Sequence, residues 1–162
     1  MTQMAPQTEE RMRRAFKGLN RFMVFMWKAR MGGLINIWPA VFGCIMVIKH
    51  VGRKSRLTRY APVNYANVDG DVYCVAGFGS ISDWYRNIMD LPDVELWLPG
   101  ERFAARAEDV SDSAQRLSLL RAVLIASGFA AYLFGVNPRK MDDEKLHEIT
   151  VNYRLIHFVR NG

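Results

Sequence analysis

The chain of 162 residues carries a formal net charge of +6, because 22 Lys and Arg residues outnumber 16 Asp and Glu residues. Half of the residues are apolar, which lets one domain bury a core without disulfides and excludes a disordered or fibrous protein. The positive charge favours anionic partners: a phosphate, an acidic membrane surface or a nucleic acid. Cys44 and Cys74 lie in apolar runs and are expected to be free thiols, and three scattered histidines predict no metal site.

The first predicted element is a basic amphipathic helix. It is expected to start at the N-cap Thr8, run to about Met31 and stop at Gly32-Gly33, so that residues 1–32 precede a domain over residues 33–162. Two interpretations stay open: the helix packs on the domain, or its apolar stripe contacts an anionic bilayer surface. The apolar face gathers Met12, Phe16, Leu19, Met23, Met26 and Trp27, opposite Arg13, Arg14, Lys17, Arg21 and Lys28.

The next segments predict strands around a basic loop. A buried strand is expected over residues 41–48, and strands over residues 60–68 and 72–78 flank Asp69-Gly70, a strong hairpin signal. Pro62 predicts an edge strand or a position where the missing amide faces a ligand. A short helix follows over residues 81–91 and ends at Pro92.

The second half predicts a hairpin, helices and a last strand. Residues 94–98 and 102–107 pair across Pro99-Gly100, and Ser111 or Ser113 is expected to cap a helix. Residues 122–138 hold no charge, which favours a buried helix or an apolar pocket wall over a membrane span. Asn137-Pro138 predicts another helix start, and residues 151–159 a closing strand. About six hairpin-linked strands favour an α+β protein with a mainly β core, an antiparallel barrel with helices outside.

Two loops are suited to bind an anion. The first reads Gly52-Arg53-Lys54-Ser55-Arg56, where we expect a glycine to free the backbone to turn while cations and a hydroxyl face phosphate oxygens. The second reads Gly77-Phe78-Gly79-Ser80 and precedes a helix start at Asp83-Trp84-Tyr85-Arg86-Asn87, whose free amides favour negative charge. Each loop alone is a weak signal. Together they predict one phosphorylated ligand lying across the hairpin.

These motifs resemble the deazaflavin-dependent nitroreductase family, whose pattern is matched by the two loops, Ala61-Pro62-Val63, Asp69-Gly70 and Asp93-Val94. The resemblance implies a split β-barrel of the flavin-reductase type that binds coenzyme F420 and passes a hydride to an acceptor. It places the phosphate and acidic tail on the basic loop, the ring along Pro62 and Val63 with Ala76 and Gly77 opposite, and the Trp84 segment as closure. The implied cofactor-binding residues are Gly52, Arg53, Lys54, Ser55, Arg59, Pro62, Val63, Ala76, Gly77, Phe78, Gly79, Asp83, Trp84 and Asn87.

The chain departs from many relatives at Arg56, which stands in the place of a second glycine, and in its shorter glycine loop. We expect a reductase of a small hydrophobic, electron-poor acceptor such as a quinone or nitroaromatic, with the uncharged stretch as a pocket wall. Tyr60, Asn64 and Tyr132 are the candidate proton donors or substrate contacts. Alternatives are an FMN-dependent reductase of the same fold, and a non-catalytic module that keeps the coenzyme or a haem-like ligand.

The last expectations concern the location and partners of the protein. We expect a cytoplasmic protein, whose first helix either contacts the inner face of an anionic membrane or packs on the domain. Nucleic acid is the least favoured partner, and pairing into a homodimer stays open.

Overall fold

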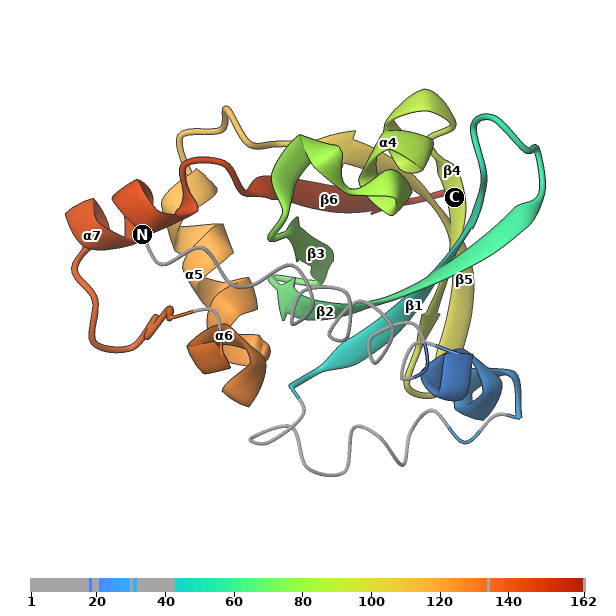
Figure 1. The fold of residues 1–162 in the computed structure, drawn as a ribbon, viewed down its shortest axis with the longest axis horizontal. Coiled ribbons are helices and arrows are strands. Elements are labelled where there is room, and N and C mark those ends of the chain that lie inside the picture. The colour runs from blue at the N-terminus through green and yellow to red at the C-terminus, as the bar shows by residue number, and fades with distance from the viewer. Residues whose placement is uncertain (1–17, 19–20, 30, 32–42, 134, 162) are drawn as a thin grey trace, which may run out of the picture.

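The computed structural model describes residues 18, 21–29, 31, 43–133 and 135–161. Within these residues, six strands form a closed antiparallel barrel in the order β1-β2-β3-β6-β5-β4 (Figure 1). The predicted split-barrel architecture is therefore confirmed. The strands are β1 Ile45–Val51, β2 Thr58–Val68, β3 Asp71–Ala76, β4 Asp93–Leu98, β5 Glu101–Asp109 and β6 Arg154–Arg160. The remaining elements are η1 Gly79–Ile81, α4 Asp83–Asp90, α5 Arg116–Ala126, α6 Phe129–Leu133 and α7 Asp143–Thr150.

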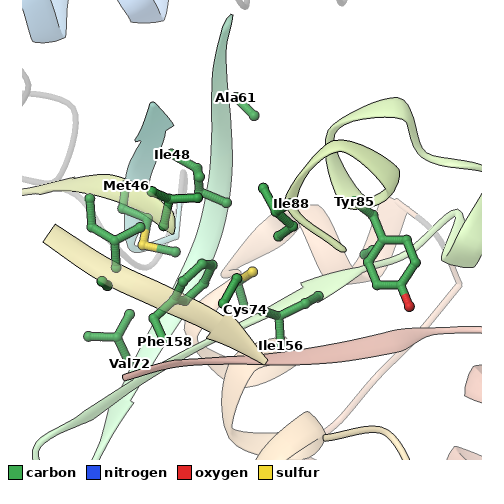
Figure 2. Close-up of a cluster of buried hydrophobic side chains, with 14 of the residues drawn as sticks. Met46, Ile48, Ala61, Val72, Cys74, Tyr85, Ile88, Ile156 and Phe158 are labelled. Carbon is green, nitrogen blue, oxygen red and sulfur yellow. The ribbon is translucent and has the colours of Figure 1, made fainter. Parts of the chain in front are cut away.

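The barrel interior is filled by alternate residues of its strands, since successive side chains of a strand point to opposite faces. Helix α4 contributes Ile88 and Tyr85 to the same buried cluster (Figure 2). Cys74 is a free thiol inside this core, and burial raises its pKa. The strand side chains that Figure 2 labels in this cluster are Met46, Ile48, Ala61, Val72, Cys74, Ile156 and Phe158.

Both predicted hairpins are present because their turns carry the residues that the geometry needs. Asp69 and Gly70 adopt φ angles of 55° and 94°, the left-handed pair of a tight turn between β2 and β3. Gly100 has a φ of 86° at the third position of the turn between β4 and β5, as a type II turn requires.

Strand β2 divides its pairing between two neighbours. Its residues 58–64 pair with β1, and its residues 65–68 pair with β3. Pro62, opposite Val47 of β1, thus lies in the stretch with one paired neighbour. This arrangement confirms the expected edge-like environment, because a proline cannot donate to a ladder on both sides.

Helices cover the outside of the barrel. Leu119 and Val123 of α5 pack against Ala66 of β2 and Leu155 of β6. In Figure 1 α5, α6 and α7 lie together on one side of the barrel, and α4 lies across its end. Within the described part of the chain, no helix has the length and apolar character that crossing a bilayer requires.

The first and last strands differ most from their predicted ranges, residues 41–48 and 151–159, and residues 41–42 lie outside the described residues. The first strand is β1, which starts at Ile45 and runs to Val51, because Gly43 with φ +75° approaches the backbone of Ser127 and leaves the sheet. The last strand is β6, which begins at Arg154 after a turn.

Two predicted caps were wrong. The N-cap of α5 is Gln115, which makes no side-chain cap hydrogen bond. Neither predicted serine caps this helix, since the Ser111 hydroxyl accepts a hydrogen bond from the Leu155 amide and the Ser113 hydroxyl accepts one from the Gln115 amide. Asn137 starts a turn rather than a helix, and α7 begins at Asp143 with Asp142 as its N-cap.

The described part of the first predicted helix packs on the barrel. Residue 18 and residues 21–28 are helical, and Trp27 is only 4% exposed, in contact with Val47 and Trp97. The Arg102 guanidinium donates to the Trp27 carbonyl at 2.9 Å. The rest of that prediction lies outside the described residues, namely the start at Thr8, Met12, Arg13, Arg14, Phe16, Lys17, Leu19 and the stop at Gly32-Gly33.

Candidate coenzyme and acceptor sites

The basic loop, residues 52–57, is closed by its own backbone. The Gly52 amide donates to the Leu57 carbonyl at 2.9 Å, and the Arg56 amide donates to the Gly52 carbonyl at 2.8 Å. The expected role of Gly52 was wrong in one respect: its φ is not in the left-handed region, and its lack of a side chain matters because a Cβ would lie 2.7 Å from the Ser55 hydroxyl. The left-handed residue is Arg56, with a φ of 55°.

Arg53 joins the basic loop to α4. Its backbone amide and its Nη1 both donate to Asn87 Oδ1, at 3.1 and 3.0 Å, and its Nη2 lies 3.3 Å from the Asp83 carboxylate. The Arg53 side chain is 22% exposed, whereas Asn87 is buried. These contacts bring together the two segments that were predicted to bind an anion. They also pair the positive charge of Arg53 with the Asp83 carboxylate, so this charge is not free to bind a ligand.

The other cations of the basic loop, and Arg59 just beyond it on β2, face solvent. Lys54, Arg56 and Arg59 are exposed, and none of them forms an ion pair within the described part of the chain. Arg59 makes a long contact of 3.5 Å with the Ser55 hydroxyl. The loop therefore presents uncompensated positive charge beside a hydroxyl, which suits a phosphate and carboxylates.

The glycine loop, residues 77–80, uses its two glycines differently. Gly79 has a φ of 60°, and a Cβ there would lie 2.2 Å from the Asn152 carbonyl oxygen, so close packing requires a glycine. Gly77 is exposed, and a Cβ there would meet nothing nearer than the Tyr153 ring at 3.9 Å. The backbone at Gly77 is thus open to approach, while Ala76 is buried inside the barrel and Phe78 is 68% exposed.

Helix α4 is also held by a partly buried hydrogen bond to β5. The Tyr85 hydroxyl donates to the Asp109 carboxylate on β5, which also accepts from the Ser111 amide at 2.8 Å. Burial, together with the hydrogen bond to Asp109, raises the pKa of Tyr85 to about 12. Trp84 is half-buried, and its ring lies edge-on to that of Tyr85.

The three candidate donors lie in two places. Tyr60 is half-buried under the N-terminal helix, with its ring 5.2 Å from that of Trp97 and the Lys28 ammonium 4.4 Å from its centroid. Asn64 donates from Nδ2 to the Cys44 carbonyl at 3.3 Å, and Tyr132 lines the same pocket as Cys44. The structure therefore places Tyr132 in the lining of that pocket, connects Asn64 to it only through Cys44, and places Tyr60 elsewhere.

That pocket, which we call the α5–α6 pocket, has a volume of about 480 Å³. Cys44 is held between α5 and β2, since its amide donates to the Ala126 carbonyl at 2.8 Å and its carbonyl accepts from the Tyr65 amide at 3.0 Å. The uncharged stretch over residues 122–138, predicted as a buried helix or an apolar pocket wall, supplies most of the residues that line this pocket. The lining residues are Cys44, Leu124, Ile125, Ala126, Gly128, Tyr132, Pro138 and Arg139.

The pocket and the basic loop stand at opposite ends of β1. Cys44 precedes Ile45, and Gly52 follows Val51, so the strand separates these two residues by roughly 26 Å at about 3.3 Å per residue. Cys44 and Arg139 were not identified from the sequence as site residues. The only local signal for Arg139 is that it follows directly on an uncharged stretch.

The chain matches one known protein family over most of its length. The sequence pattern of the family described as F420H(2)-dependent quinone reductase matches residues 19–139, most of the chain. The chain belongs to this family. The deazaflavin family inferred from the motifs is confirmed, and this quinone reductase is an oxidoreductase that uses coenzyme F420.

Solved structures support the fold of the quinone reductase at low sequence identity. A conserved hypothetical protein from Mycobacterium tuberculosis is 15% identical, with a TM-score of 0.53, covering 80% of this chain and 79% of that one. HutZ, the heme storage protein from Vibrio cholerae, is 11% identical, with a TM-score of 0.52, covering 80% of this chain and 89% of its own. No curated protein matches the sequence. These likenesses establish a shared barrel and nothing about ligands.

The residues of the quinone reductase fit an acidic coenzyme on the observed geometry. Lys54, Arg56 and Arg59 supply charge that no described carboxylate neutralises, and Gly77 leaves its backbone open. Of the expected contacts, Ala76 is 1% exposed and presents no side chain at the surface, while Val63 is half-buried against the barrel core.

Proposed function

We propose that the basic loop binds the phosphate and acidic tail of F420 through Lys54, Ser55, Arg56 and Arg59, with Arg53 holding the loop on α4. The observation that carries this proposal is the joining of the two anion-binding segments by Arg53, Asp83 and Asn87. A positioned loop binds its ligand at a lower entropic cost than a mobile one, because less conformational freedom is lost on binding.

The ring of the coenzyme is proposed to lie along β2 at Pro62 and Val63, with the open backbone of Gly77 facing it. Pro62 supports this placement because it stands where β2 has one paired neighbour. When bound, the reduced coenzyme supplies a hydride. The chain then has to orient the ring, exclude water and hold an acceptor beside it.

The α5–α6 pocket is proposed to hold the acceptor, a quinone, with nitroaromatics as further substrates. Its wall is mostly apolar, which suits a planar hydrophobic ring, and Tyr132 offers a hydroxyl that can donate to an acceptor oxygen. Asn64 links the pocket to the coenzyme strand, because it lies on β2 and donates to the pocket residue Cys44 at 3.3 Å. Tyr60, packed against Trp97, then serves the docking of the N-terminal helix.

A fluorescence titration tests the coenzyme site. Purified protein is titrated with oxidised F420 and with FMN, and the variant Lys54→Ala/Arg59→Ala is compared with Arg160→Ala/Lys145→Ala, which removes the same charge from distant surface positions. We expect F420 binding, a loss of about 2 to 4 kcal/mol in the loop variant, the scale of two charged hydrogen bonds, and little change in the control. Preference for FMN, or equal affinities of the two variants, would contradict the proposal.

We further propose that the N-terminal helix brings the enzyme to an anionic membrane surface, where lipid-soluble quinones reside. Trp27 faces the barrel, but Phe22 and Phe25, three residues apart on the helix, are 56% and 64% exposed. The cations Arg21 and Lys28 flank them and are exposed. Exposed aromatic side chains next to cations favour binding to the interface of an anionic bilayer.

A vesicle assay tests membrane binding. The variant Phe22→Ser/Phe25→Ser is compared with Leu57→Ser/Ile81→Ser, which removes two other exposed apolar side chains. We expect wild type to sediment with phosphatidylglycerol vesicles and less with phosphatidylcholine, and the helix variant to lose this binding while keeping its affinity for F420. Equal sedimentation of wild type and helix variant would refute the membrane role.

A further inference from the structure

We propose that Arg139 binds the acceptor oxygen that becomes negatively charged during reduction, and so makes the α5–α6 pocket prefer an anionic ring. This inference rests on the proposed function of the pocket. Arg139 is one of its lining residues, beside apolar side chains, the Cys44 thiol and the Tyr132 phenol.

The turn that carries Arg139 is held in place from the pocket wall. Within the turn, the Asn137 carbonyl accepts hydrogen bonds from the amides of Lys140 and Met141, at 3.2 and 3.0 Å. Arg121 of α5 donates from Nη1 to the carbonyls of Pro138 and, at 2.9 Å, Met141. Arg121 stands one helical turn before Leu124 and Ile125, so one helix supplies both a pocket wall and the support of the turn.

The charge of Arg139 is not neutralised by the acidic residues that follow it. The Asp143 carboxylate lies 2.7 Å from Arg121 Nη2, and the Asp142 carboxylate accepts from the Lys145 amide at 2.8 Å as the N-cap of α7. Arg139 forms no ion pair or hydrogen bond through its side chain with any other residue that the structure describes. Arg139, exposed and without a described ion-pair partner, is thus a lining residue of a mainly apolar pocket.

Without Arg139, the pocket would disfavour negative charge. Leu124, Ile125 and Ala126 form the C-terminal end of α5, where the helix dipole places partial negative charge. The carbonyls of Ile125 and Ala126 are hydrogen-bonded to the amides of Gly128 and Cys44, which weakens this effect without reversing it. Arg139 is the charged residue among those that line the pocket, and its full positive charge outweighs the partial negative charge at the end of the helix.

Quinone reduction needs such a charge. A quinone that takes up a hydride, which is two electrons and one proton, becomes a hydroquinone monoanion whose charge lies on a ring oxygen, and one further proton gives the neutral quinol. A guanidinium stays protonated throughout and offers several N–H donors to that oxygen. A group that binds the anion more strongly than the neutral quinone lowers the barrier to the chemical step.

Binding of stable ring anions tests the inference without turnover. The probes are 2-hydroxy-1,4-naphthoquinone, which is ionised at neutral pH, and 2-methoxy-1,4-naphthoquinone, which is neutral and of similar shape. Calorimetry gives the ratio of their dissociation constants for wild type, Arg139→Gln, Arg139→Lys and the distant control Arg160→Gln. We expect wild type and Arg160→Gln to prefer the anion by about tenfold, the scale of one charge-assisted hydrogen bond, Arg139→Lys to keep most of this preference, and Arg139→Gln to lose it.

The outcomes separate the inference from the proposal beneath it. An unchanged ratio in a folded Arg139→Gln variant, with both rings bound, overturns the role of Arg139 and leaves the pocket assignment standing. Failure of wild type to bind either ring overturns both, while the F420 titration still reports on the coenzyme site. Competition between the two probes and a substrate quinone places them in one pocket, and its absence also counts against the inference.

Discussion

A single oxygen of Asn87 holds Arg53 twice, accepting from its backbone amide at 3.1 Å and from its Nη1 at 3.0 Å. The backbone bond fixes the course of the basic loop, and the side-chain bond aims the guanidinium at Asp83, 3.3 Å away. Asn87 is buried, so water does not readily replace it. In this arrangement Arg53 is a structural cation, and binding of an anion is left to its exposed neighbours.

Removing the Asn87 amide should loosen the loop. We expect Asn87→Ala to lower the free energy of unfolding by about 1 to 3 kcal/mol, because two partly buried donors of Arg53 lose their acceptor, and to weaken F420 binding. Asn87→Asp keeps an oxygen at the same place and should retain most of both. Urea unfolding and fluorescence titration measure the two effects, and an Asn87→Ala protein with wild-type affinity would show that the loop needs no such support.

Arg56 should be a site where stability and binding oppose each other. Its φ of 55° is costly for any residue with a side chain. Allowing for the greater chain entropy of glycine, we expect Arg56→Gly to stabilise the fold by about 0.5 to 1 kcal/mol while weakening F420 binding through the lost charge. Lys54→Gly, a neighbour outside the left-handed region, should weaken binding and destabilise. Chemical denaturation of both variants measures these changes in the free energy of unfolding, and a destabilised Arg56→Gly would refute the strain argument.

The hairpins of the fold were predictable because their signals are local. Asp69-Gly70 places two left-handed residues, and Pro99-Gly100 places one at Gly100, where a tight turn needs them. The caps were not predictable, because the Ser111 hydroxyl is taken by the amide of Leu155 on β6, far along the chain. A side chain whose partner is brought by tertiary structure cannot be read from its neighbours.

The candidate site was predictable only where its signals lie close together in the sequence. The two anion loops could be identified from their residues, but the pairing of Arg53 with Asn87 spans 34 positions and changes which cations are free. The pocket joins Cys44, before the first strand, to Arg139, which is placed by Arg121 of α5. No sequence period relates these residues.

The two glycines of the glycine loop should respond oppositely to alanine. At Gly79, a Cβ 2.2 Å from the Asn152 carbonyl and a φ of 60° together predict a severely destabilised or unfolded protein. At Gly77, a Cβ has 3.9 Å to its nearest neighbour, so Gly77→Ala should fold normally and lose F420 affinity by about tenfold, because the methyl blocks approach to the backbone. Thermal unfolding and titration check the pair. Unaltered F420 binding by Gly77→Ala would show that the coenzyme ring does not lie beside the Gly77 backbone.

Tyr85 should make stability depend on alkaline pH. Its pKa rises from an ordinary value of 10.0 to about 12 in the folded protein, so the folded state keeps its proton where the unfolded chain loses it. The contribution is complete below pH 10 and is lost as the pH rises through 12. At pH 11 we expect wild type to have lost about 1.4 kcal/mol relative to pH 8 through this group. Urea unfolding of Tyr85→Phe at both values should lack that loss, and parallel profiles would contradict the assignment.

Arg121 should control the shape of the α5–α6 pocket through its backbone contacts rather than its ion pair. Arg121→Met removes the donors to the carbonyls of Pro138 and Met141, and we expect a loss of about 1 to 3 kcal/mol in the free energy of unfolding. It should also raise KM for a quinone more than it changes F420 binding. Asp143→Asn removes only the partner of Arg121 at 2.7 Å, whose side chain is 78% exposed, and should cost less than about 1 kcal/mol. Equal effects of the two variants in urea unfolding and quinone kinetics would mean that the ion pair, not the turn, positions this wall.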